Sequence, residues 1–234
     1  MGNNEYSEEY TRTVMDRRST KPIAMTQVMG LLSFMFLAMA AGAFLLPPQY
    51  FIPAVIIEFI LIFAIPILSG RDAAEGKEPA LGLTGGLALV FAACTGAVLG
   101  PTVQMLMSTA NGAILLGQAS LVTFIVFASC GVYGYLTRRN LSTWSKALFT
   151  SLLVLLGIMI LSLFFRSNPL SLAIGLGGAV LFGLLTAFDF QRMKHSTSDE
   201  TVMVALNIFL DFINLFTFIL NIVMIFNGGF GSRD

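Results

Sequence analysis

An aspartate, Asp211, stands inside the last long apolar stretch of the chain, residues 203–226. The stretch is long enough to cross a bilayer as a helix, and an acid near the centre of such a helix costs about 2.5–3.5 kcal/mol on insertion scales. Asn207 and Asn214 would share the helix face of Asp211. We therefore expect this polar stripe to face protein or water, either as part of an ion path or as hydrogen-bonding groups between helices.

Two further acids lie in or at the edge of apolar stretches. Glu58 is near the middle of residues 51–69, and Asp189 is near the end of residues 170–191. No Lys or Arg occupies the interior of such a stretch, so a proton, a cation or polar groups must compensate a buried carboxylate. If residues 170–191 and 203–226 form a hairpin, and the first helix continues for about a turn past Asp189, then Asp189 and Asp211 reach similar depth. The alternative is that Asp189 is an interfacial helix end.

Paired carboxylates would make this place sensitive to pH. Two ionised carboxylates about 4 Å apart repel by roughly 4 kcal/mol at an effective dielectric constant of about 20. Asp189 and Asp211 would therefore share one proton near neutral pH and titrate as a unit. The shared proton would hold the helices together, and its loss would separate them or admit a cation. Because carboxylate oxygens are hard ligands, the metal that suits Asp189 and Asp211 is Ca²⁺.

Composition identifies the class of protein. The chain has 234 residues, of which 56% are hydrophobic and 11% charged, and its formal net charge is zero. This is too apolar for a soluble domain and typical of one polytopic domain in a lipid bilayer. The balanced charge gives no argument for a nucleic-acid partner.

The apolar stretches predict an all-α membrane protein with seven transmembrane helices. We expect a cytoplasmic N-terminal tail at residues 1–23, a transmembrane domain at residues 24–226 and a short C-terminal tail at residues 227–234. The expected spans are residues 24–46, 51–69, 80–100, 112–136, 146–165, 170–191 and 203–226.

Basic residues predict the orientation. Eleven of the 13 Lys and Arg fall in the N-terminal tail and in the connections after spans two, four and six. The other two, Arg166 and Arg233, fall on the opposite side. By the positive-inside rule, the N-terminus is expected to be cytoplasmic and the C-terminus to lie across the membrane.

Three segments resemble one known family. Residues 208–216, around Asp211, resemble the last-helix signature of the Bax inhibitor-1 family, the transmembrane Bax-inhibitor-motif proteins. Residues 185–191, with Lys194 following, are similar to its sixth-helix motif, and residues 131–142 to its short basic loop after the fourth helix. The likeness covers most of the chain, and bacterial inner-membrane members are the most similar.

The resemblance implies six helices around a central seventh and a pH-dependent Ca²⁺ leak. It implies that Asp189 and Asp211 are the pH sensor and that Glu58 takes part in ion passage. One position departs from the family member used for comparison, in which an arginine latches to the aspartate pair. Ser69 stands there in this chain, so Arg71, two residues further on, is the candidate latch.

Two other functions stay open beside a cation leak. The same acids would serve a proton-coupled cation exchanger, and a non-transporting protein that binds other membrane proteins, such as a membrane protease, would not need them ionisable. The chain has no metalloprotease, nucleophile-elbow, P-loop or dinucleotide motif. We therefore expect neither an enzyme nor a bound cofactor, with Ca²⁺ as the transported ion.

Overall fold

The structure is a computed structural model, and it describes residues 25–74, 82–165 and 167–227. The expected N-terminal tail, residues 1–23, lies outside the described residues, as does all but the first residue of the expected C-terminal tail. Within the described part, seven helices are long and apolar enough to cross a membrane, and there is no strand. The predicted all-α fold with seven spans is confirmed. The helices are α2 (Met25–Leu45), α3 (Phe51–Ala74), α4 (Leu83–Met107), α5 (Gly112–Leu136), α6 (Ser145–Ser162), α7 (Asn168–His195) and α8 (Thr201–Phe226).

Two spans continue through positions where the sequence seemed to end them. The third span was expected to stop at Gly100, before a proline, but α4 runs on to Met107 with Pro101 inside it. The second was expected to stop at Ser69, but α3 continues to Ala74. A proline removes one backbone hydrogen bond of a helix, and membrane helices tolerate this because neighbouring groups satisfy the freed carbonyl.

The fifth and sixth spans also differ from expectation at their ends. The helix α6 ends at Ser162 rather than at residue 165. Just after this end, the N–H of Leu163 donates a hydrogen bond to the carbonyl of Ile160 (3.2 Å), which closes a tighter final turn. The helix α7 begins at Asn168, capped by the Ser167 side chain, and ends at His195, a turn beyond the expected residue 191. The extra turn carries basic side chains, which the negative end of the helix dipole favours.

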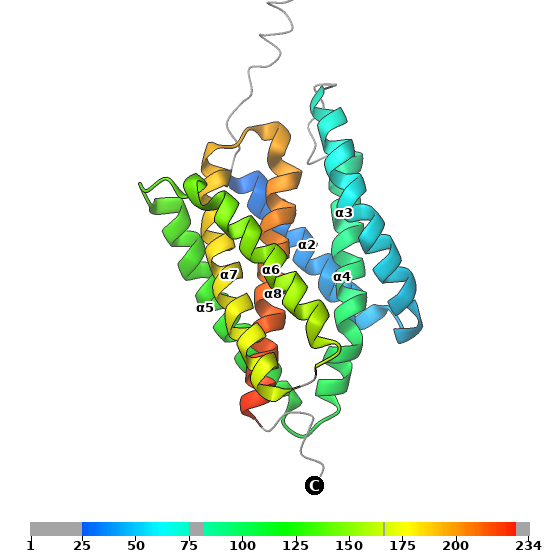
Figure 1. The fold of residues 1–234 in the computed structure, drawn as a ribbon. Helices are drawn as coiled ribbons and strands as arrows, with labels where there is room; N and C mark the ends of the chain where they lie inside the picture. Colours follow the sequence, from blue (N-terminus) through cyan, green and yellow to red (C-terminus); the bar gives the residue numbers. More distant parts are fainter. Residues whose placement is uncertain (1–24, 75–81, 166, 228–234) are drawn as a thin grey trace, which may run out of the picture.

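The last helix, α8, packs against α2, α3, α4, α5 and α7, whereas α6 packs mainly against α7 and α3 mainly against α4. Figure 1 shows α8 inside the bundle, with α3 and α4 on one side and α5 and α7 on the other. The three-residue turn η4 (Ser198–Glu200) joins α7 to α8.

Glycines let two pairs of helices touch backbone to backbone. A Cβ atom on Gly42 of α2 would overlap the carbonyl oxygen of Ala93 in α4, and one on Gly96 of α4 would overlap that of Met39 in α2. At the interface of α5 and α7, a Cβ on Gly134 would overlap the carbonyl of Ala187. Without a hydrophobic driving force in lipid, such close approach is a main source of helix association.

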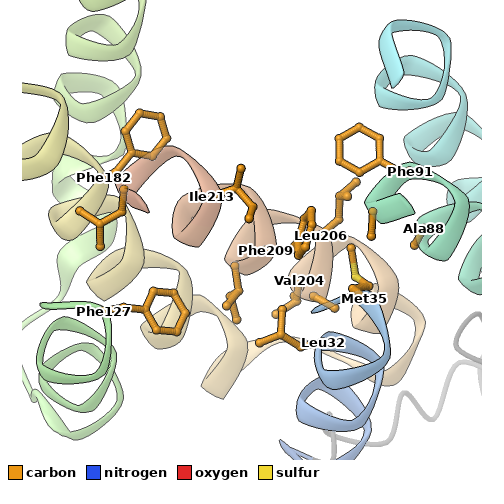
Figure 2. Close-up of a cluster of buried hydrophobic side chains, with 14 of the residues drawn as sticks. Leu32, Met35, Ala88, Phe91, Phe127, Phe182, Val204, Leu206, Phe209 and Ile213 are labelled. Carbon is orange, nitrogen blue, oxygen red and sulfur yellow. The ribbon is translucent and has the colours of Figure 1, made fainter. Parts of the chain in front are cut away.

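Aromatic rings fill the core on both sides of α8. Phe209 lies 5.5 Å from Phe36 and 6.3 Å from Phe91, measured between ring centroids. Phe212 lies 4.7 Å from Phe36 and 5.1 Å from Phe127, both edge to face. Figure 2 shows Phe209 of α8 in the buried cluster, with Phe91 and Met35 on one side and Phe127 and Phe182 on the other. The core therefore joins α8 to both flanks of the bundle.

Large apolar side chains also cover the outside. On α3, for example, most of the long side chains are exposed, and this is the arrangement expected of a helix that faces lipid acyl chains. The exposed residues of α3 include Ile52, Ile56, Phe59, Ile60, Phe63 and Ile67.

Candidate functional site

The structure brings Asp189 of α7 and Asp211 of α8 together. The two helices form an antiparallel hairpin, and α7 stays helical for six residues past Asp189. Both side chains are buried, with 8% of Asp189 and 4% of Asp211 exposed, and their carboxyl groups are in hydrogen-bonding contact. Asp189 is therefore an inward-facing member of a pair, not an exposed helix end.

Contact between two carboxyl groups requires a proton. An ionised carboxylate has acceptors only, so one partner must be protonated to donate the hydrogen bond. Oδ2 of Asp211 is buried and accepts no hydrogen bond from a donor group among the described residues. If both carboxyl groups were ionised, two buried negative charges would have too few hydrogen-bond donors around them. Burying such charges away from water is costly.

A cation stands beside the pair. Arg192 follows Asp189 by three residues, on the same helix face, and its charge acts on the Asp189 carboxyl group. The Arg192 guanidinium also pairs with Glu200 of η4 at 3.5 Å, and both of these side chains are about two-fifths exposed. Arg192 was not singled out for this role from the sequence, although its spacing of three residues from Asp189 was a visible signal.

The connection between α5 and α6 is fastened to α7 next to the pair. Gln191, only 8% exposed, accepts a hydrogen bond from the Leu141 backbone N–H (2.7 Å) and donates one to the Arg139 carbonyl (2.6 Å). Leu141 begins a short 3₁₀ helix, η3 (Leu141–Trp144), which leads into α6. Sequence reasoning did not single out Gln191, because its partners are backbone atoms that carry no residue-type signal.

Glu58 lies elsewhere, between α3 and α4. Its carboxylate accepts a hydrogen bond from the hydroxyl of Thr95 in α4 at 2.6 Å. Along α3, Glu58 is eleven residues before Ser69, roughly 16 Å at the rise of a helix. The structure therefore gives Glu58 its own polar partner rather than joining it to the aspartates.

The candidate latch is on the surface. Ser69 is buried, with 4% exposed, near the end of α3, and this helix contacts η4. Arg71 is in the last turn and its side chain is exposed. The positive charge that acts on Asp189 comes instead from Arg192.

The amides of α8 follow the same face but do not form one network. Asn207 is half-buried. Asn214 donates to the Leu210 carbonyl of its own helix at 2.8 Å. The side-chain oxygen of Asn221 is buried with no partner among the described residues. The hydrogen bond that Asn214 donates therefore does not bridge two helices.

The described residues contain no group of three or more His, Cys, Asp or Glu side chains placed to hold a metal ion. The carboxyl pair of Asp189 and Asp211 offers two such ligands. Since Ca²⁺ usually takes six to eight oxygen ligands, this pair could contact an ion that keeps much of its water.

Seven apolar helices, with a buried carboxyl pair between α7 and α8, define a polytopic membrane protein with a titratable site. Residues 22–228 match the family model described as "Inhibitor of apoptosis-promoting Bax1". The chain belongs to this Bax inhibitor-1 family.

Relatives are found across bacteria. An uncharacterized protein of Campylobacter jejuni is 30% identical over 95% of this chain and 98% of its own length. An uncharacterized membrane protein of Vibrio cholerae is 28% identical over 59% of this chain and 62% of its own. An uncharacterized protein of Lactococcus lactis is 36% identical over 56% of each.

Proposed function

We propose that this protein is a pH-sensitive Ca²⁺ leak channel, gated by the proton shared between Asp189 and Asp211. The observation that carries the proposal is the buried contact between these two carboxyl groups on neighbouring membrane helices. Ionisable side chains inside a membrane are costly and rare, and those that occur usually mark functional sites. It also requires a proton, which links helix packing to pH.

The gate works by repulsion. With one shared proton, α7 and α8 are hydrogen-bonded at this depth and the path is closed. When the proton leaves, two charges about 4 Å apart repel by roughly 4 kcal/mol at an effective dielectric constant of about 20. Because 1.36 kcal/mol is a factor of ten in an equilibrium constant, this repulsion suffices to shift a closed-to-open ratio by about a thousandfold. Flux should therefore rise with pH.

Along the proposed path, few side chains of the protein are available to coordinate the ion. Two carboxyl groups at the gate, and Glu58 with Thr95 further along, suit a hard cation that passes rather than one that stays. Asn207 and Asn214 of α8 would supply neutral oxygens on the same path. Arg192, beside Asp189, takes the place that the family resemblance gave to Arg71.

The protein is proposed to lie in the bacterial cytoplasmic membrane with its N-terminus in the cytoplasm. The connection from α5 to α6 and the end of α7 lie at the same end of the bundle (Figure 1), and basic residues of both segments line one cavity. By the positive-inside rule this end is cytoplasmic.

The test is Ca²⁺ flux into liposomes that contain purified protein, between about pH 6 and 8, for wild type, Asp189→Asn and Asp211→Asn. The proposal predicts a flux that rises with pH in wild type and a flat response in both variants. Flux that requires an opposing proton gradient would instead indicate a proton-coupled exchanger. If protein-dependent flux is absent, the leak is refuted and binding of other membrane proteins becomes the function to pursue.

A further inference from the structure

A basic cavity of ≈ 790 Å³ opens at the end of the bundle where α5 and α7 finish. Its wall is formed by the connection after α5, the last turns of α7 and the turn η4. Three arginines, a lysine and a histidine line it, against one acid, together with uncharged hydrogen-bonding side chains. The basic and acidic lining residues are Arg138, Arg139, Arg192, Lys194, His195 and Glu200.

Within the described residues, the positive charge in this cavity exceeds the negative charge that lines it. In the described part of the chain, Glu200 is the one acid that pairs with these cations, and it does so through Arg192. Lys194 lies over the ring of Tyr135, 5.8 Å from its centroid. Arg138 and Arg139 have exposed side chains. Uncompensated guanidinium groups around one cavity favour a phosphate, because their donors match its oxygens.

An apolar cavity of ≈ 200 Å³ adjoins the basic one, and Phe188 lines both. It lies between α5, α7 and the start of α6, and its walls are almost entirely carbon. Its lining includes Cys130, Tyr133, Trp144 and Leu148. The two cavities together therefore present a charged part and a hydrocarbon part to a single molecule.

The position matches the headgroup level of a bilayer. Tyr133, Tyr135 and Trp144 surround this end of the bundle, and such rings are enriched where membrane meets water. Basic pockets at the cytoplasmic surface attract anionic headgroups by this geometry and charge. A soluble phosphate would use the basic cavity alone and would leave the apolar one without a role.

We infer that the two cavities form a binding site for an anionic phospholipid, with its phosphate in the basic cavity and an acyl chain against Phe188 and Trp144. The inference does not rest on the proposed leak, since it concerns binding. It does place a ligand against Arg192, which also acts on Asp189.

The single tryptophan of the chain allows a direct test, because Trp144 lines the apolar cavity. Brominated acyl chains quench tryptophan fluorescence only at short range. Purified protein is reconstituted in phosphatidylcholine bilayers with a small share of brominated phosphatidylglycerol or, in parallel, the same share of brominated phosphatidylcholine. We expect stronger quenching by the anionic lipid.

The matched variants are Arg138→Gln with Arg139→Gln, and Lys146→Gln. Lys146 lies just after this connection, in the first turn of α6, and lines a different groove, between α6 and α7. Two lost charges near the surface should weaken the preference for the anionic lipid about thirtyfold, whereas Lys146→Gln should keep most of it. The hydrogen bond that Gln191 donates goes to the Arg139 backbone and is not removed.

Three results would overturn the inference. Equal quenching by the two lipids in wild type would show no anionic site. An unchanged preference in the double arginine variant, with thermal unfolding like that of wild type, would place the lipid elsewhere. Loss of the preference when inorganic phosphate is added to wild type would assign the basic cavity to free phosphate.

Discussion

Asp211→Asn is the sharpest test of the shared-proton gate. The asparagine amide can donate a hydrogen bond to Asp189 without any proton from solvent, and it is nearly the same size as the aspartate it replaces. The helix pair should therefore stay closed across the pH range in which wild type opens. The change removes titration from this position while leaving the contact between α7 and α8 in place.

The expected size follows from the contact. Loss of a single proton with a midpoint near neutral takes the deprotonated fraction from about 10% at pH 6 to about 90% at pH 8, so wild-type flux should rise about ninefold. The repulsion of roughly 4 kcal/mol that drives opening is absent in the variant, because one partner is neutral. Its flux at pH 8 should be no higher than that of wild type at pH 6.

The assay is Ca²⁺ entry into liposomes, with the internal and external pH equal at each step. Asp199→Asn is the matched control, since Asp199 is an acid of the same hairpin that lies on η4 and accepts a hydrogen bond from Thr197. The control should keep the wild-type pH response.

The reasoning fails if Asp211→Asn shows the ninefold rise of wild type, or if the Asp199→Asn control flattens to the same degree. The first result would mean that another group senses pH. The second would mean that general charge on the hairpin, rather than the buried contact, sets the response.

Three further outcomes are expected. Gly96→Ala should destabilise the protein by about 1–3 kcal/mol, because its Cβ would meet a backbone carbonyl of α2, and thermal unfolding should show no loss for Gly86→Ala, where nothing lies within 4 Å. Gln191→Ala should cost about 1–3 kcal/mol by leaving the backbone N–H of the buried Leu141 and the Arg139 carbonyl without their partner. It should also speed proteolysis at residues 137–144, while Gln118→Ala, on an exposed part of α5, should not. Glu58→Gln should lower Ca²⁺ flux on the order of tenfold if a charged carboxylate helps the ion pass, without moving the pH midpoint; an unchanged flux would remove Glu58 from the path.

The aspartate pair could be predicted because its signal was local and strong. An acid in the middle of an apolar helix needs a polar partner inside the protein. The hairpin between α7 and α8 determines which side chain that partner is. The number of helices was predictable for the same reason, since each span is a long apolar run. By contrast, the end of α4 was not, because Pro101 looks like a helix terminus in sequence. Whether a helix can contain such a proline depends on the neighbouring groups that pack against it, and these are known only from the fold.

The surroundings of the pair were harder to foresee. Gln191 bonds to backbone atoms 50 and 52 residues earlier in the chain, and backbone partners cannot be recognised from residue types in the sequence. Arg192 was visible at the right spacing, but its side chain could equally have reached for the membrane surface. The direction in which the Arg192 side chain points depends on Glu200 of the turn η4, whose carboxylate lies 3.5 Å from the Arg192 guanidinium.

The glycine contacts described above divide the bundle mechanically. The backbones of α2 and α4 touch, as do those of α5 and α7. Because close-packed backbones cannot slide without a clash, we expect each pair to move as one body. The helix α8 meets both bodies through aromatic rings, and Phe212 touches Phe36 of one and Phe127 of the other edge to face. Rings in such contacts can slip past one another with little change in packed volume. Relative motion in this protein is therefore expected as shear along α8, in the manner of packed helices that shift by small translations.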